Sequence, residues 1–254
     1  MKRIELFNLP MDVASLEETV NSISQRLDER RFTQHVVVNV AKVVNSGKDK
    51  SLGRSVRECD LVNIDGMGVV WGARFLGHHV PERVAGIDLF NALLAMSARK
   101  QLPVFFLGAR AEVVKKAVNA AEAANPDLHV AGYHHGYFWE DEEAVVEKIR
   151  ASGARLLFVA ITSPLKENFI NAWREKLGVD FVMGVGGTFD VLSGKVKRAP
   201  QWMQRAGLEW LYRVIQEPRR MWKRYLVTNS AFAWLLVQQR WDHVFASGEF
   251  GFGD

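Results

Sequence analysis

Three polar side chains lie where short apolar runs of this 254-residue sequence end: Asn39, Asp65 and Asp190. The runs are typical of buried strands, and ligands of an open α/β sheet bind at the carboxyl ends of its strands. Gly66 follows Asp65 and allows a sharp turn that leaves the carboxylate accessible. A carboxylate in such a place is suited to take a proton from a hydroxyl group as a general base. The alternative is that Asp65 caps the following helix.

Arg83 and a glycine-rich segment are suited to bind phosphate. Arg83 lies just before a predicted helix, where a guanidinium and a helix N-terminus would both favour a phosphate group. The alternative for Arg83 is a surface ion pair with Glu82 or Asp88. The glycines of segment 184–190 follow the last predicted strand and would let backbone amides approach a phosphate or ribose, with Asp190 on the ribose hydroxyls. The alternative is a plain turn capped by Asp190.

Several other chemistries lack their residues. A dinucleotide-binding loop would need a third glycine after Gly66-Met67-Gly68, and Trp71 stands in its place. The histidines include two adjacent pairs, at 78–79 and 134–135, and no cysteine or spaced carboxylate completes a ligand set around them. We therefore expect no metal and no cofactor. The single cysteine excludes an internal disulfide framework and fits a reducing cytosol.

Short apolar runs alternate with helical patterns over the first 194 residues. The predicted strands are His35–Asn39, Leu61–Asp65, Pro103–Gly108, Leu128–Tyr133, Arg155–Ile161 and Phe181–Gly186. Helical segments are expected near 41–57, 87–100, 110–124, 141–152 and 165–177, and Ser15 with Glu18 resembles a capping box that opens an earlier helix. This alternation predicts an α/β core over residues 1–194, with a Rossmann-like, mainly parallel sheet flanked by helices.

Residues 195–254 form a predicted helical appendage of different composition. Its part from Lys195 to Arg240 carries a net charge of +8, whereas the whole chain carries +4. Four of the eight tryptophans lie there, and Pro218 should divide its apolar stripe between two helices. The appendage therefore predicts an anionic membrane surface as a partner. The alternatives are a nucleic-acid-binding module and a purely structural helical subdomain. No apolar run reaches the roughly 18 residues of a spanning helix.

Several motifs resemble those of the WecG/TagA/CpsF glycosyltransferase family, in order and over nearly the whole chain. They include Asn-Ile-Asp-Gly-Met-Gly at 63–68, Glu-Arg-Val-Ala-Gly-Ile-Asp-Leu at 82–89 and His-Gly-Tyr-Phe at 135–138. Further along come Gly-Val-Gly-Gly-Thr-Phe-Asp-Val-Leu-Ser-Gly at 184–194, a long motif at 198–213 and Glu-Pro-Arg-Arg at 217–220. The resemblance implies inverting transfer of a sugar from a UDP-sugar to an acceptor on a polyprenyl diphosphate lipid, without a metal. It also implies recruitment to the inner face of the cytoplasmic membrane.

The resemblance also implies roles for individual residues. Asp65 matches the family's proposed general base, with Asn39 and Arg83 at active-site positions beside it. The positions that would hold the nucleotide-sugar are Tyr137, Gly186, Asp190, Pro164, Lys166 and Glu167. Those that would meet the departing diphosphate are Arg213, Arg220 and Arg224. Preorganised arginines would stabilise the charge of that leaving group in place of a metal.

One motif departs from the family pattern. The family usually has Gly-x-Pro-Lys-Gln-Glu after the fifth strand, and here the segment 162–167 reads Thr-Ser-Pro-Leu-Lys-Glu. Lys166 therefore stands where the family has Gln. An ammonium cannot reproduce the paired donor and acceptor of an amide, so the departure leaves both an N-acetylmannosamine-type and a glucose-type donor open. The alternative is that Lys166 is a solvated helix residue.

Two rival functions and the assembly state complete the sequence hypotheses. A nucleotide-sugar or NAD(P)-dependent oxidoreductase would need a complete glycine fingerprint, which is missing. Nucleic-acid binding is not expected, because the tail aromatics recur at helical spacing rather than on a strand face. The oligomeric state is left open, with a homo-oligomer among the alternatives.

Overall fold

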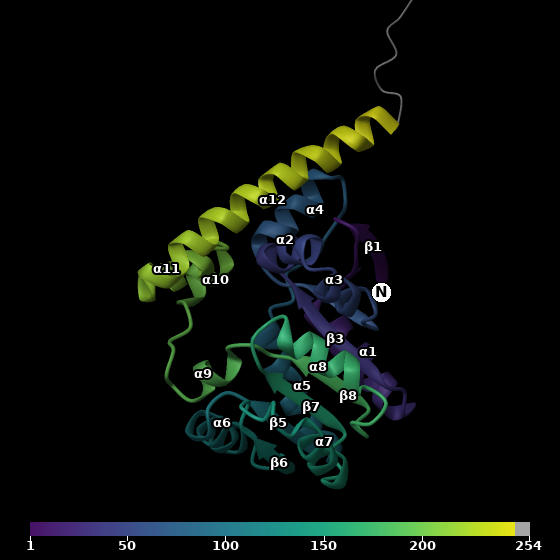
Figure 1. Cartoon of the computed structure of the whole chain (residues 1–254), viewed down its shortest axis with the longest axis vertical. Helices are drawn as coiled ribbons and strands as arrows, with labels where there is room; N and C mark the ends of the chain where they lie inside the picture. The colour runs from purple at the N-terminus through teal and green to yellow at the C-terminus, as the bar shows by residue number, and fades with distance from the viewer. Residues whose placement is uncertain (247–254) are drawn as a thin grey trace, which may run out of the picture.

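An eight-stranded sheet with helices on both faces forms the centre of the described chain (Figure 1). The computed structural model describes residues 1–246, apart from the side chains of Arg220 and of residues 242–246. The strands lie in the order β1-β2-β4-β3-β8-β7-β5-β6, and every neighbouring pair is parallel except β1 with β2. The predicted mainly parallel α/β sheet is therefore confirmed. The strands are Lys2–Leu6 (β1), Leu9–Val13 (β2), Thr33–Val38 (β3), Leu61–Ile64 (β4), Val104–Gly108 (β5), Val130–His134 (β6), Leu156–Ala160 (β7) and Phe181–Gly184 (β8).

The helices alternate with the strands and then continue alone. Up to residue 194 they are Leu16–Asp28 (α1), Val40–Lys48 (α2), Lys50–Arg57 (α3), Met67–Phe75 (α4), Gly86–Lys100 (α5), Ala111–Ala124 (α6), Glu142–Ala151 (α7), Leu165–Trp173 (α8) and Thr188–Leu192 (α9). The appendage contains Gln201–Arg205 (α10), Glu209–Gln216 (α11) and Pro218–Ala246 (α12). The predicted capping box is present at the start of α1, where the Ser15 side chain accepts a hydrogen bond from the Glu18 backbone.

The central strands are buried on both faces. Along β5, Val104 and Phe106 pack in one apolar cluster with residues of α1, α5 and α6, whereas Phe105 and Leu107 pack in another with residues of α7 and α8. Side chains of a strand alternate between the two faces of a sheet, so both sets of positions must be apolar. This explains why the sequence shows continuous apolar runs rather than an alternating pattern.

The amino-terminal hairpin and helix α4 are absent from the predicted elements. Strands β1 and β2 are joined by a two-residue turn in which Phe7 and Asn8 have φ of 55° and 58°. Tight hairpins of this kind are normally signalled by Asn-Gly or Asp-Gly, and Phe-Asn lacks that signal. Helix α4 begins directly after the polar turn at Asp65 and is too short to show a clear helical period.

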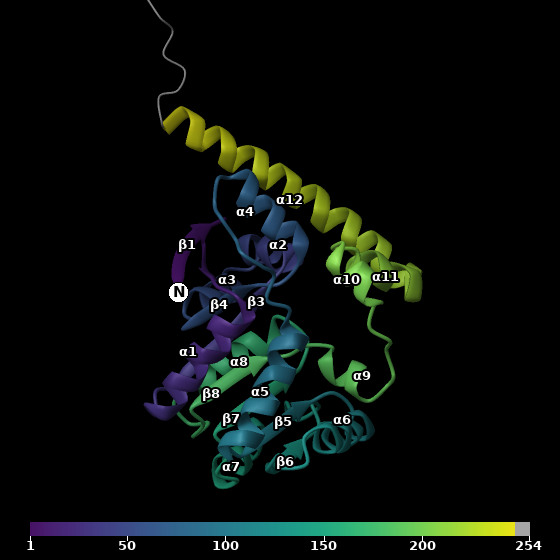
Figure 2. The ribbon, with the colours of Figure 1, turned by 180° about the vertical axis from the view of Figure 1, so that it is seen from behind.

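The predicted change to purely helical structure after Gly194 is confirmed in the described residues, as is the break at Pro218. Helix α11 ends at Gln216, and α12 begins with Pro218. Proline suits this position because a backbone N–H in the first helical turn would have no partner within the helix. Helix α12 lies along α2 and α4 (Figures 1 and 2). A side chain at Gly72 of α4 would meet the Phe232 ring and Leu236 of α12 at 3.0 Å. The appendage therefore packs closely on the core, and the boundary at residue 195 stays a prediction.

None of the helices within residues 1–246 combines the length and apolar character needed to cross a bilayer.

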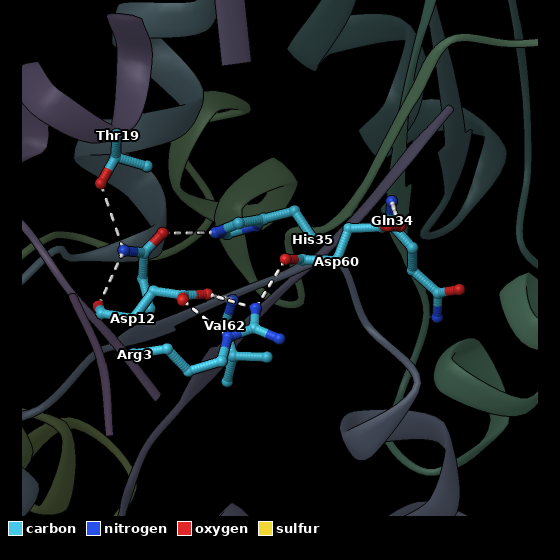
Figure 3. Close-up of polar contacts among 8 residues, drawn as sticks. Arg3, Asp12, Thr19, Gln34, His35, Asp60 and Val62 are labelled. Atoms are coloured by element: carbon cyan, nitrogen blue, oxygen red, sulfur yellow. Dashed lines mark hydrogen bonds and ion pairs between the residues drawn. The ribbon is translucent and has the colours of Figure 1, made fainter. Parts of the chain in front are cut away.

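A buried polar network stabilises the junction between the hairpin and the parallel strands (Figure 3). Arg3 donates to both carboxylate oxygens of Asp12 at 2.8 and 2.7 Å, and the backbone N–H of Val62 donates to Asp12 at 2.8 Å. Deeper in the core, the Nε2 of His35 lies 2.9 Å from the Oδ1 of Asn63. Burial lowers the pKa of His35 to about 4, although the bond to Asn63 opposes this effect. His35 is therefore neutral and donates from Nε2.

We expect His35 to make the protein less stable as pH falls. Its pKa is about 4 in the folded protein and 6.5 ordinarily, so between these values the unfolded chain binds the proton and the folded chain does not. Full passage through that window corresponds to about 3 kcal/mol of unfolding free energy. Urea denaturation at several pH values between 7 and 4 should show a shallower pH dependence in His35→Gln than in wild type. The exposed His79→Gln is the matched control, and an equal pH dependence in all three proteins would contradict the assignment.

Candidate active site

Two of the predicted site residues meet at the carboxyl ends of the adjacent strands β3 and β4. Asn39 follows β3 and caps α2, where its side chain accepts a hydrogen bond from the Lys42 backbone at 3.0 Å. Asp65 follows β4, and its backbone N–H donates to the carbonyl of Val38 at 2.8 Å. Gly66 has φ of 110°, and a side chain there would contact the Cβ of Asn39 at 3.5 Å. The turn therefore holds Asn39 and Asp65 side by side.

Asp65 does not cap helix α4. Gly66 occupies the cap position, and no side chain bonds to the first turn of α4. The Asp65 carboxylate points instead toward the start of α5, where the Gly86 backbone N–H donates to it at 3.4 Å. The capping alternative is therefore wrong, and the carboxylate is left available for chemistry.

Burial dominates the electrostatics of Asp65. Removal from water raises the pKa of this carboxyl above its usual value, and the negative charge of Glu209 adds to the effect. The positive charges of Arg83 and Arg213 and the Gly86 N–H act in the opposite direction. A buried carboxylate that stays ionised beside cations is a stronger base than an exposed one, which is the property a general base needs near neutral pH.

Arg83 is paired with the appendage. Its Nη1 lies 2.8 Å from the Oε2 of Glu209 in α11, and only 13% and 16% of these two side chains are exposed. The predicted alternative of a pair with Glu82 or Asp88 is wrong. Glu82 accepts from the backbone N–H of Leu16, and Asp88 is held by Arg198. Sequence patterns did not indicate Glu209, because it lies 126 residues from Arg83 along the chain.

The appendage brings further polar groups toward Asp65. The pKa of Tyr225 in α12 is raised by burial, opposed by the charges of Arg213 and Arg224 and reinforced by those of Glu209 and Asp65. The side chains of Arg213 and Arg224 are exposed and form no ion pair with any described residue. They are therefore available to an anionic ligand. The side chain of Arg220, the third arginine predicted for this role, lies outside the described residues.

Two neighbouring hollows lie beyond the carboxyl ends of β5 and β6. The larger, about 470 Å³, is lined by Arg110, Ala111, Glu112, His135 and Tyr137. The smaller, about 320 Å³, is lined by Arg110, Glu112, Val113, Lys116, Ser193, Gly194 and Lys195. Lys195 bonds to Asp190 at 2.9 Å, and Tyr137 has 66% of its surface exposed. The hollows thus connect the surroundings of Tyr137 and Asp190 through Arg110, an exposed cation that the sequence motifs did not single out.

The glycine-rich turn after β8 has the conformation expected of it. Gly186 has φ of 54°, and a side chain there would meet no atom within 4 Å. Asp190 lies in the first turn of α9 without capping it, so the alternative of a plain Asp-capped turn is wrong. The space beside the Cα of Gly186 is therefore open on that side.

A buried charge cluster lies beneath the start of α8. The Oε1 of Glu167 accepts from Lys42 at 2.7 Å and from Lys166 at 2.8 Å, while its Oε2 has no hydrogen-bond partner in the described chain. Burial, reinforced by Lys42, lowers the pKa of Lys166 to about 8. Burial opposes ionisation of Glu167 as well, but the two ammonium groups lower its pKa to about 2. Lys166 is only 6% exposed, so the alternative of a solvated helix residue is wrong.

The remaining residues of segment 162–167 shape this cluster. Pro164 stands at the cap position of α8, after a cis peptide bond from Ser163. The methylene groups of Lys166 cover Gly184 at the end of β8, where any side chain would collide with them. The cluster thus joins the ends of β3, β7 and β8, next to Asn39. Lys42 is a member that sequence motifs missed.

Comparison with known proteins identifies the family of the chain. A sequence model described as "Glycosyl transferase WecG/TagA/CpsF family" matches residues 4–245. The chain belongs to this glycosyltransferase family. The resemblance predicted from the motifs is confirmed, and family membership favours a transferase over the oxidoreductase considered from the sequence.

Two relatives in this glycosyltransferase family carry the same name. A protein of Bacillus subtilis (strain 168) is 33% identical over 227 residues, which cover 89% of this chain and 88% of the relative. A protein of Bacillus spizizenii (strain ATCC 23059 / NRRL B-14472 / W23) is 40% identical over 181 residues, covering 71% of this chain and 70% of the relative. Each is named N-acetylglucosaminyldiphosphoundecaprenol N-acetyl-beta-D-mannosaminyltransferase.

We expect Lys166→Gln to change substrate recognition by this glycosyltransferase. The substitution replaces a buried ammonium by a neutral amide and leaves Glu167 with Lys42 alone, so the polar groups beside Asn39 must rearrange. The Michaelis constant for donor or acceptor should change by about 10-fold, the size of a charge-assisted hydrogen bond. The exposed Lys48→Gln in α2 is the matched control. Unchanged Michaelis constants and an unchanged donor profile would show that the cluster is purely structural.

Proposed function

We propose that the protein is an inverting glycosyltransferase that moves a sugar from a UDP-sugar to an acceptor on a polyprenyl diphosphate lipid, in the synthesis of a bacterial cell-surface polysaccharide. The observation that carries this proposal is the Asp65 carboxylate, which lies at the end of β4 without capping a helix and is influenced by the charges of Arg83, Arg213 and Glu209. The relatives' names support the acceptor class, since both names specify a diphosphoundecaprenol-linked acceptor.

Asp65 would act as the general base in a single displacement. The acceptor hydroxyl attacks the anomeric carbon from the face opposite UDP, and its proton passes to the Asp65 carboxylate. A bond from the acceptor oxygen to the anomeric carbon forms while the bond to the β-phosphate oxygen breaks, and the electron pair leaves with UDP. Because one displacement occurs, the anomeric configuration is inverted. Asn39 and Arg83 would orient the reacting groups beside Asp65.

Cations from the appendage would stabilise the leaving group. UDP gains negative charge as the sugar departs, and the guanidinium groups of Arg213 and Arg224 are exposed and unpaired among the described residues. Arg220 is proposed for the same role. The nucleotide would occupy the hollows around Arg110, with Tyr137, Gly186 and Asp190 as its contacts.

The donor sugar would be of the N-acetylmannosamine type or the glucose type. The relatives' names contain an N-acetylmannosaminyl group, which supports the first. Segment 162–167 supports the second, because Lys166 departs from the family pattern and its partner Glu167 is paired with Lys42, whose backbone bonds to Asn39.

The outward face of α12 would place the enzyme on an anionic membrane. Phe232, Met221 and Thr228 lie on one buried face of this helix, and at 100° per residue the opposite face carries other apolar residues. Leu226, Trp234 and Val237 lie on that face, and Trp222 lies at its border, about 100° from Met221; each is at least 44% exposed. Arg219 and Lys223 are also exposed near the start of the helix. Mixed tryptophans and cations are typical of helices that lie in a membrane interface, so we propose a peripheral location on the inner face of the cytoplasmic membrane.

We expect Asp65→Asn to reduce turnover by about 10²- to 10⁴-fold, the usual contribution of a general base. The amide keeps the shape of the side chain but cannot accept the proton. Release of UDP from a panel of UDP-sugars, with a short-chain polyprenyl diphosphate acceptor, measures the loss. Affinity for UDP, measured by calorimetry, should be preserved as the control for folding. Turnover equal to wild type at saturating acceptor would remove Asp65 from this role.

We expect the double variant Trp222→Gln/Trp234→Gln to bind anionic vesicles more weakly than wild type while unfolding at the same temperature. If four or five cations of the appendage face the lipid, they contribute about 4 to 5 kcal/mol before screening by salt. Flotation with phosphatidylglycerol vesicles should therefore weaken as salt is raised, and phosphatidylcholine vesicles should bind little. Equal, salt-insensitive binding to both kinds of vesicle would contradict electrostatic docking.

A further inference from the structure

Four charged side chains form a continuous network between the core and the appendage. Arg83 and Asp88 belong to the core, and Arg198 and Glu209 belong to the segment after Gly194. Arg198 forms a two-pronged pair with Asp88 at 2.5 and 2.8 Å, and its Nε lies 3.5 Å from the Oε1 of Glu209. The other oxygen of Glu209 holds Arg83 at 2.8 Å. Glu209 is thus the central carboxylate of the network, with one oxygen for each arginine.

The two ends of the network differ in their surroundings. At the Asp88 end the carboxylate is 39% exposed, so water screens the pair. At the Glu209–Arg83 end both side chains are less than one fifth exposed, and their charges act over longer distances. This end adjoins Asp65, whose ionisation responds to Arg83, Glu209 and Arg213 and to the Gly86 N–H. Tyr225 from α12 is influenced by the same charges.

Glu209 acts on Asp65 in two ways. It holds the Arg83 guanidinium in one orientation, which fixes where that positive charge lies relative to the base. Its own negative charge also disfavours a second ionised carboxylate nearby. Both effects exist only while α11 is seated on the core, because Glu209 is the first residue of that helix.

We infer that Glu209 is a positioning residue of the transfer reaction, which orients Arg83 beside Asp65 and makes the competence of the base depend on the seated appendage. This inference rests on the proposed function. If the network only held the appendage on the core, breaking the Arg83–Glu209 pair and breaking the Asp88–Arg198 pair would have the same effect on the reaction.

Cutting the two ends separately tests the inference. Glu209→Gln frees Arg83 and removes the negative charge near Asp65, while Asp88→Asn, the matched control, loosens Arg198 and leaves the Arg83–Glu209 pair in place. We expect Glu209→Gln to lower kcat/KM by about 10- to 100-fold, as small misplacements of catalytic groups do. Because a charge that disfavours ionised Asp65 is lost, the acidic limb of the pH profile should move to lower pH. Asp88→Asn should leave that limb in place. Glu209→Asp, which keeps the charge, should keep the limb and lose part of kcat.

A second measurement is independent of turnover. The carboxyl carbon of Asp65, labelled with ¹³C and assigned with Asp65→Asn, can be titrated by NMR in each variant. We expect its midpoint to fall in Glu209→Gln and to stay in Asp88→Asn. An unmoved midpoint, or equal effects of the two variants on the midpoint and the pH limb, would overturn the inference. If wild type transfers no sugar from any UDP-sugar while the midpoint still falls, the proposed function fails and the electrostatic action of Glu209 on Asp65 stands.

Discussion

A carboxylate withdrawn from water has to be accompanied by positive charge or hydrogen-bond donors, and the arrangement around Asp65 follows from this requirement. The Gly86 N–H donates to the Asp65 carboxylate because the turn after β4 faces the start of α5. The cations come from farther away: Arg83 from the segment before α5 and Arg213 from α11. A core that ended at Gly194 would keep Arg83, but it would lose both the positive charge of Arg213 and the opposing negative charge of Glu209. Composition divides the chain into a core and an appendage, but charged groups of both parts act on Asp65.

The sequence predicted those parts of the structure that depend on local periodicity. All six predicted strands exist within a few residues of their predicted ends, the capping box of α1 is present and Pro218 separates two helices. The positions of Asn39 and Asp65 at strand ends could also be predicted, whereas their meeting depends on the pairing of β3 with β4, which only the structure shows. The hairpin of β1 and β2 could not, because its turn residues Phe7 and Asn8 carry no strong turn signal.

Two of the missed site residues, Glu209 and Lys42, share one property: their partners are distant in sequence. Glu209 lies 126 residues from Arg83, and Lys42 lies 125 residues from Glu167. Such pairs have no spacing that a periodic pattern could reveal. The Lys42–Glu167–Lys166 cluster also shows why one substitution in a motif carries weight. Two ammonium groups share one oxygen of a single buried carboxylate, so the cluster holds one more positive charge than negative while both lysines are protonated. Excess buried charge is costly unless something nearby balances it.

Helix α12 has two apolar faces, and natural selection acts on them through different properties. Phe232 and Met221 leave water when the chain folds, so substitutions there lower the stability and hence the amount of folded protein. Trp222 and Trp234 keep more than half of their surface exposed in the folded protein, so their replacement alters the free energy of folding less. Substitutions on the inner face are thus selected for the stability of the fold, and substitutions on the outer face for the interactions that this face makes. In a survey of tolerated substitutions along this helix, positions selected for stability should therefore recur every three to four residues, with positions selected for interactions between them.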